Sequence, residues 1–177
     1  MELEAILPGS QLEILFQLLV AMALGMAMGA ERSIAQKTAG MRTYALVSMG
    51  SALFVILSTL VTSAYIGISA FDPLRVTAAV IVGIGFLGAG LIIFRGSTLQ
   101  GLTTAAGMWV TAGVGMAVGF KLYLIAIFTT ILTLFVFTAM WVIENFVEKH
   151  INFFPDNGKH EATPHESERS EESQTTD

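Results

Sequence analysis

Cysteine is absent from the 177 residues, which excludes disulfides, thiolate metal sites and cysteine nucleophiles. Charge is scarce as well, because Asp, Glu, Lys and Arg make up 13% of the chain, whereas an average soluble protein has about 25%. Hydrophobic residues instead account for 54% of the sequence, and the mean hydropathy is +0.69. This composition predicts a membrane protein, whose first partner is the lipid bilayer.

Acidic residues are almost missing from the middle of the chain. Nine of the fourteen lie between Glu144 and Asp177, and residues 14–143 contain only Glu31 and Asp72. Residues 157–177 lack Val, Ile, Leu, Phe, Trp and Tyr. Because such a segment cannot bury enough apolar surface to offset its ordering entropy, we expect it to be largely disordered. We interpret residues 144–177 as an acidic cytoplasmic tail, either a solvated one or a regulatory one that binds a partner.

Five apolar runs are long enough to cross a bilayer, whose core of about 30 Å requires about 20 residues of helix. They cover residues 12–30, 44–66, 73–94, 101–120 and 122–143. The predicted fold is an all-α membrane protein with a bundle of five transmembrane helices over residues 12–143. The fourth run is rich in Gly, Ala and Thr, so we expect its neighbours to shield it from lipid. Residues 1–11 lack the basic region of a cleaved signal peptide and are expected to form a short external N-terminus.

Basic residues predict the orientation, because short loops rich in Lys and Arg stay on the cytoplasmic side. With the N-terminus outside, the inner segments hold seven basic residues: Arg32, Lys37, Arg42, Arg95, Lys149, Lys159 and Arg169. The outer segments then hold only Arg75 and Lys121. The N-terminus is therefore predicted outside and the C-terminus in the cytoplasm.

Small residues recur at spacings that allow helices to approach closely. GMAMG and GMAVG are both GxxxG motifs, which pack helices within one bundle or form a dimer face; their glycines are Gly25, Gly29, Gly115 and Gly119. The run GIGFLGAG places Gly83, Gly85, Gly88 and Gly90 on the third helix. It matches GxGxxG formally, but a dinucleotide site should follow a strand and open a helix. We expect these glycines to give a smooth surface for another helix or for a thin polar passage.

The segment FDPLR predicts the start of the third helix at the outer face. Asp72 suits an N-cap and Pro73 the first helical position. Arg75 follows Asp72 by three residues, a spacing that allows an ion pair. Alternatively, Asp72 is a carboxylate that attracts cations or gates a passage, and it is the one weak candidate for a metal ligand.

At the inner face, the predicted topology brings Arg32, Arg42 and Arg95 close to Glu31. These side chains are candidates for a polar cluster with an ion-paired carboxylate. The alternative is that the arginines only follow the charge rule and contact lipid phosphate. On the fourth helix, Thr103, Thr104 and Thr111 are expected to donate hydrogen bonds to carbonyls one turn earlier.

Four motifs carry a resemblance to a known family. In this order and spacing, GAERSIAQKTAGMRTYALVSMGSALF, DPLR, GIGFLGAGLIIFRG and QGLTTAAGMWVTAGVG resemble the transmembrane domain of the MgtC/SapB family of bacterial inner-membrane proteins. The resemblance covers residues 12–143. It implies a five-span bundle linked to growth at low magnesium, to survival of pathogens inside phagocytes and, in MgtC-like members, to restraint of the proton-translocating ATP synthase.

The resemblance also marks individual residues. It assigns family motifs to Glu31, Arg32, Arg42, Thr43, Asp72, Arg75, Gly83, Gly85, Gly88, Gly90, Arg95, Gly101, Thr103, Thr104 and Trp109. One departure is clear, since MgtC-like members often continue into a folded cytoplasmic domain resembling ACT modules. Here 34 mostly polar residues follow residue 143, so the chain is more similar to the short SapB-like members.

Two functions remain open at this stage. In the first, a non-enzymatic regulatory module recognises another membrane protein, with the ATP synthase, a transporter or a second copy of the chain as candidates. In the second, a transporter or channel moves Mg²⁺ or protons along the third and fourth helices. The second is disfavoured for Mg²⁺, because carboxylates usually hold this ion and ion pathways carry ionisable residues in mid-membrane.

Other classes of function fit poorly. His150, His160 and His165 are spaced ten and five residues apart and provide no helical metal pair. No nucleophile with a nearby base is recognisable, so we expect no enzyme and no cofactor. Nucleic-acid binding is not expected either, because the tail is acidic.

Overall fold

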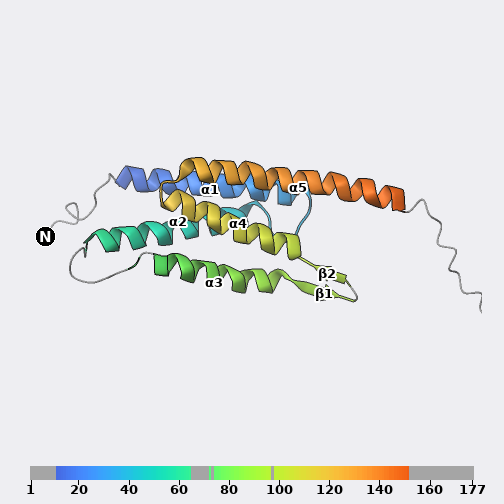
Figure 1. Cartoon of the computed structure of the whole chain (residues 1–177), viewed down its shortest axis with the longest axis horizontal. Coiled ribbons are helices and arrows are strands. Elements are labelled where there is room, and N and C mark those ends of the chain that lie inside the picture. Colours follow the sequence, from blue (N-terminus) through green and yellow to red (C-terminus); the bar gives the residue numbers. More distant parts are fainter. Residues whose placement is uncertain (1–10, 65–71, 73, 97, 152–177) are drawn as a thin grey trace, which may run out of the picture. The chain divides into compact units, whose positions relative to one another are not determined.

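The computed structural model describes residues 11–64, 72, 74–96 and 98–151. Five helices cover most of them (Figure 1): α1 (Gln11–Ile34), α2 (Met41–Ala64), α3 (Leu74–Leu91), α4 (Leu102–Gly119) and α5 (Tyr123–Ile151). Each is long and apolar enough to cross a membrane. The all-helical fold and the presence of five helices of membrane-spanning length and composition are therefore confirmed. The predicted N-terminal segment and most of the acidic tail lie outside the described residues.

A small hairpin between α3 and α4 was not predicted. Helix α3 ends at Leu91, three residues before the predicted end of the run, and β1 (Ile93–Arg95) pairs antiparallel with β2 (Thr98–Gln100). Strands of three residues are too short to show a period in the sequence. Gly101 directly follows β2. Its φ of 92° is left-handed, and the Cα hydrogen that a β-carbon would replace faces the Leu91 carbonyl oxygen. Any other residue would be strained at this φ, and its β-carbon would overlap the Leu91 carbonyl oxygen, so only glycine fits there.

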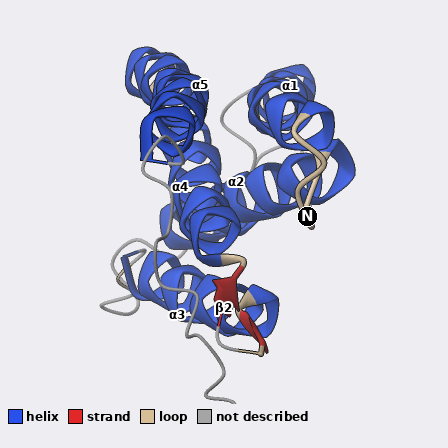
Figure 2. Ribbon diagram, turned by 90° about the vertical axis from the view of Figure 1, so that its right-hand side faces the viewer, coloured by secondary structure: helices blue, strands red, loops and turns tan. Residues whose placement is uncertain are grey.

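Helix α4 occupies the centre of the bundle. Its backbone contacts α1, α2 and α3, and Figure 2 shows it between α2, α3 and α5. It has the largest buried share of the five spans, which confirms the expectation that its neighbours shield it from lipid. Its small side chains make this position possible, because helices in lipid approach closely only where side chains are short.

Both GxxxG motifs face α2. A β-carbon at Gly25 would lie 2.6 Å from the Tyr44 carbonyl oxygen, and one at Gly119 would lie 2.8 Å from Val55 Cβ. A β-carbon at Gly115 would overlap the Ser48 carbonyl oxygen. Helix α2 is thus held between the glycine face of α1 and the glycine face of α4, so these contacts form within one chain.

Helix α5 packs through one stripe of side chains. Ala126, Thr130 and Phe137 are buried, whereas Phe128 and Phe135 on other faces are exposed. This stripe belongs to the first of two compact units, which ends at Met140. Residues 141–151 complete α5 as the described part of the second unit.

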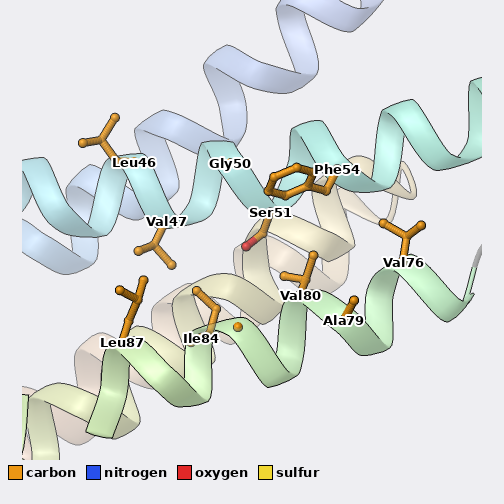
Figure 3. A pocket seen from close by; sticks show the side chains of 11 residues that line it. Leu46, Val47, Gly50, Ser51, Phe54, Val76, Ala79, Val80, Ile84 and Leu87 are labelled. Carbon is orange, nitrogen blue, oxygen red and sulfur yellow. The ribbon is translucent and has the colours of Figure 1, made fainter. Parts of the chain in front are cut away.

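Helices α2 and α3 leave a groove between them. Its volume is about 560 Å³, and every lining residue except Ser51 is apolar (Figure 3). It opens to the surroundings of the bundle, which for a membrane-spanning helix means lipid.

Candidate functional site

The site begins at the last turns of α1. The buried residues of this helix form one stripe: Gln17, Ala21, Gly25, Met28, Gly29 and Arg32. Arg32 therefore lies on the same face as the glycine motif, and its side chain is only 4% exposed. Its Nε donates a hydrogen bond to Oε2 of Glu31, which is 20% exposed. The buried face of α1 thus places the charge of Arg32 inside the bundle, where the carboxylate of the neighbouring Glu31 pairs with it.

An aromatic ring completes the environment of this arginine. The Arg32 guanidinium carbon lies 3.8 Å from the centroid of the Phe137 ring, which α5 supplies. A guanidinium over a ring is attracted by the negative face of the ring, and the attraction grows when water is excluded. Arg32 therefore links α1 to α5 through both charge and packing.

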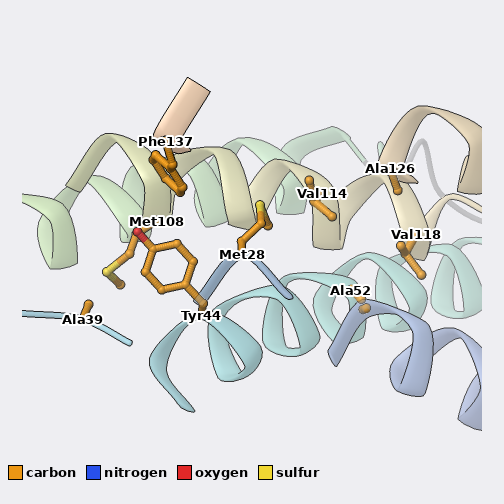
Figure 4. Close-up of a cluster of buried hydrophobic side chains, with 10 residues drawn as sticks. Met28, Ala39, Tyr44, Ala52, Met108, Val114, Val118, Ala126 and Phe137 are labelled. Atoms are coloured by element: carbon orange, nitrogen blue, oxygen red, sulfur yellow. The ribbon is translucent and has the colours of Figure 1, made fainter. Parts of the chain in front are cut away.

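A second polar contact lies at the same end of the bundle (Figure 4). The Tyr44 side chain is fully buried, and its hydroxyl donates a hydrogen bond of 3.3 Å to the Thr104 carbonyl oxygen. Gly107 leaves room for two rings here, because a β-carbon at this position would lie 2.5 Å from the Tyr44 hydroxyl and 2.6 Å from Phe137 Cζ. Tyr44 and Gly107 were not singled out from the sequence.

Together these residues form a closed polar cluster, which we define as Glu31, Arg32, Tyr44, Thr104, Gly107 and Phe137. They come from α1, α2, α4 and α5. A buried charge is costly unless a partner compensates it, and here Glu31 and the Phe137 ring do so within the chain. The cluster is suited to hold four helices in register.

The predicted convergence of arginines on Glu31 is wrong for Arg42. Among the described residues Arg42 makes no ion pair with Glu31, and both Arg42 and Thr43 are exposed. The reason is the helical period, because Tyr44 and Ala45 turn the other face of α2 into the bundle. Arg95 lies in β1, and its side chain is outside the described part.

At the opposite end of the spans, Asp72 caps α3. One of its carboxylate oxygens accepts a hydrogen bond of 2.9 Å from the Leu74 backbone N–H, as expected for an N-cap. The predicted ion pair with Arg75 is not present between these two described side chains, and both are exposed. The carboxylate turns to the helix backbone instead of the guanidinium.

Two contacts at this end were missed from the sequence. The Gln17 amide nitrogen donates to the carbonyl oxygens of Val118 and Gly119 at 3.3 and 3.4 Å, which caps the end of α4. Lys121 donates a hydrogen bond of 2.6 Å to Glu13, and this bond raises the pKa of the lysine above 10.5. The available signal for Gln17 was its place two helical turns before Gly25 on one face of α1.

The glycines of α3 are mostly open. A β-carbon at Gly83, Gly85 or Gly90 would meet no atom within 4 Å, and only Gly88 faces a neighbour, Ala105 at 3.6 Å. The predicted smooth surface therefore touches no other part of the described chain at three of its four glycines, and one of these, Gly83, lines the α2–α3 groove.

The remaining predicted residues lie on α4. Thr103 and Trp109 are exposed, whereas Thr104 and Thr111 are buried. Thr111 donates a hydrogen bond of 2.8 Å to the Gly107 carbonyl oxygen, which confirms the expected bond to the preceding turn for this threonine. Of the three histidines, none has a described side chain.

The fold and the cluster define a class: a multi-pass α-helical membrane protein with a buried arginine in its bundle. A family model described as MgtC family matches residues 18–146. The chain belongs to the MgtC family. The resemblance that the four motifs indicated is therefore confirmed.

Curated relatives share this region. YhiD of Escherichia coli strain K12, named "Putative magnesium transporter YhiD", is 44% identical over 124 residues, which is 67% of this chain and 56% of YhiD. Protein MgtC of Salmonella typhimurium strain LT2 is 44% identical over 120 residues, 68% of this chain and 49% of MgtC. An uncharacterized protein of Synechocystis is 38% identical over 135 residues, 76% of this chain and 55% of the relative. This chain thus spans about half the length of these relatives, and no solved structure matches it.

Proposed function

We propose that this protein is a non-enzymatic regulatory module of the bacterial inner membrane, linked to magnesium homeostasis and stress adaptation. The observation that supports this most is the closed polar cluster. Arg32 is paired with the Glu31 carboxylate and lies over the Phe137 ring of the same chain, so the cluster stabilises a scaffold and leaves no unpaired charge for a passing ion.

The lining of the spans supports the same proposal. Mg²⁺ is held by oxygen ligands, above all carboxylates. Among the described residues, no three His, Asp or Glu side chains come together as such a group. The α2–α3 groove is apolar, and so are most walls of a smaller cavity between α3, α4 and α5 beside Trp109.

The proposed module recognises a membrane-protein partner through one face of α3. We define the outer α3 face as Ala78, Val82, Gly85 and Ala89, four exposed residues that share one side of the helix. Small residues on such a face let a second helix approach closely. By resemblance, the candidate partners are the ATP synthase, a transporter or a second copy of this chain.

The test is a crosslinked pulldown from native membranes at low magnesium. Gly85→Leu adds a large side chain where no atom lies within 4 Å, so the chain should fold while close approach of a partner helix is blocked. Gly113→Leu on α4 is the control, because its β-carbon also meets no atom within 4 Å but its side chain enters the cavity between α3, α4 and α5 instead of the outer α3 face. Equal capture with Gly85→Leu and with the unmodified chain would contradict recognition through this face.

Cation transport is the second candidate, and the name of the Escherichia coli relative favours it. Oligomers would multiply the carboxylates of Glu31 and Asp72. Purified protein in liposomes that contain a Mg²⁺-sensitive dye separates the two functions. Influx that rises with protein and is blocked by Asp72→Asn would establish transport and overturn the regulatory proposal.

The orientation belongs to the proposal as well. With the N-terminus outside, the α1–α2 connection lies on the cytoplasmic side, with Lys37 in the loop and Arg32 and Arg42 on the adjoining helix ends, as the positive-inside rule expects. Fused after Lys37, a reporter that is active in the cytoplasm should give a signal, and one that is active only in the periplasm should give none. Activity of a periplasmic reporter at this residue would show that the orientation of every loop is the reverse of the proposed one.

A further inference from the structure

The α2–α3 groove has the dimensions of a lipid chain. On α3 its lining runs from Val76 to Leu87, which at the helical rise is about 16 Å. Half of a bilayer core is about 15 Å. The groove is therefore about as long as one leaflet is deep, and Figure 3 shows side chains of both helices directed into it.

Its length and volume suit an acyl chain. The volume is about 560 Å³ along about 16 Å of α3. Two glycines create this space, because a β-carbon at Gly50 or Gly83 would meet no atom within 4 Å.

Two opposite charges lie at the end of α3 where the groove begins, although neither residue is part of its lining. Arg75 precedes the first lining residue, Val76, and its exposed guanidinium has no ion-pair partner among the described residues. Asp72 is also exposed, with one carboxylate oxygen on the Leu74 N–H. A guanidinium suits a phosphate, with which it forms paired charge-assisted hydrogen bonds. The neighbouring carboxylate suits an ammonium and repels a second anion.

We propose that the groove is a binding site for phosphatidylethanolamine, in the leaflet where Arg75 lies. One acyl chain fills the space between α2 and α3, the phosphate binds Arg75, and the headgroup ammonium lies at Asp72. The apolar lining of the groove is on the other side of α3 from the outer α3 face, whereas Arg75, three residues before Ala78, lies at the edge of that face.

Native mass spectrometry of the purified full chain in detergent tests this assignment, with phosphatidylethanolamine and phosphatidylglycerol of the same chains as probes. Gly50→Leu and Gly83→Leu each add a side chain to the groove lining at a position where the new β-carbon meets no atom of the chain within 4 Å. Each should weaken phosphatidylethanolamine binding about tenfold, or about 1.4 kcal/mol. Gly85→Leu is the matched control, since it is equally open but lines no part of the groove, and should bind as the unmodified chain does.

The headgroup is tested separately. Arg75→Gln should also weaken binding about tenfold, whereas Arg42→Gln, an exposed arginine on another helix, should not change it. Asp72→Asn should remove the preference for phosphatidylethanolamine over phosphatidylglycerol. Unchanged binding in both Gly50→Leu and Gly83→Leu, or equal binding of the two lipids by the unmodified chain, would overturn the proposal.

A photo-crosslinking amino acid at Val80, which lines the groove, identifies the occupant in native membranes. Crosslinks to phospholipid support the site. Crosslinks to a protein, either a second copy or another chain, would show that the groove accepts a helix and that the assignment is wrong. A protein crosslink at Val80 would overturn the lipid site but would not decide whether the outer α3 face binds a partner. The pulldown with Gly85→Leu tests that proposed function independently.

Discussion

Glu31→Gln should destabilise the bundle, although it only replaces one carboxylate oxygen by an amide NH₂ group. It leaves the Arg32 guanidinium, which is 4% exposed, without a negative partner. Removing one member of a buried ion pair costs about 3–5 kcal/mol. Two features of this pair lower the cost, since Glu31 is 20% exposed and glutamine keeps an oxygen that accepts a hydrogen bond. We therefore expect a loss of about 2 kcal/mol in the free energy of unfolding.

The chain provides a matched comparison. Glu13→Gln is the same substitution in the pair with Lys121, whose side chains are 41% and 54% exposed, so its effect should be much smaller because solvent screens exposed pairs. Equilibrium unfolding in mixed micelles, followed by tryptophan fluorescence, measures both variants. The double variant Glu31→Gln with Arg32→Met should recover part of the loss, because it no longer buries an unpaired charge.

Equal stability of Glu31→Gln and Glu13→Gln would refute this reasoning. It would mean that the Phe137 ring and the surrounding lipid compensate Arg32 without the carboxylate. The closed polar cluster would then lose its role as the charge-neutral support of the bundle, and the main argument for the regulatory proposal would lose its basis.

Three further predictions follow from single contacts. Gly115→Leu should abolish the monodisperse peak in fluorescence-detected gel filtration, because its β-carbon overlaps the Ser48 carbonyl oxygen, whereas Gly113→Leu, which is open, should keep the peak. Gly107→Ala should lower the free energy of unfolding by about 1–3 kcal/mol, since the added methyl meets Tyr44 and Phe137. The double variant with Phe137→Leu should restore part of this loss. If the double variant is no more stable than Gly107→Ala, the packing of these side chains is contradicted. The hydrogen bond to Glu13 raises the pKa of Lys121. The stabilisation by this bond is therefore present below the ordinary lysine pKa of 10.5 and is lost as the pH rises through the raised pKa. The thermal unfolding temperatures of the unmodified chain and of Lys121→Met should converge at high pH, and a difference that stays constant with pH would refute a contribution of this bond to stability.

The sequence predicted the membrane spans well because the required information is local. A run of about 20 apolar residues must form a helix in a bilayer, where every backbone polar group needs a partner within the chain. The same holds for Asp72, which caps a helix that starts two residues later. The hairpin of Ile93–Arg95 with Thr98–Gln100 was not predicted, since its pairing leaves no periodic signal over three residues.

The candidate site was predicted only in part. Glu31 and Arg32 were recognised because they interrupt an apolar run, and neighbours in sequence remain neighbours in space. Arg42 was grouped with them by topology, but one residue step around α2 decides which side chain enters the bundle, and this is Tyr44. Phe137 and Gly107 looked like any other aromatic and glycine of a span.

The sequence by itself therefore determined that this chain has five helices long and apolar enough to span a membrane, because hydropathy acts over one helix at a time. The tertiary structure decided what those helices do to one another. It set Arg32 beneath a ring 105 positions along the chain and a tyrosine hydroxyl on a carbonyl 60 positions away. It also opened the groove at Gly50 and Gly83, since contacts between distant segments depend on helix rotation and spacing, which no single run of residues specifies.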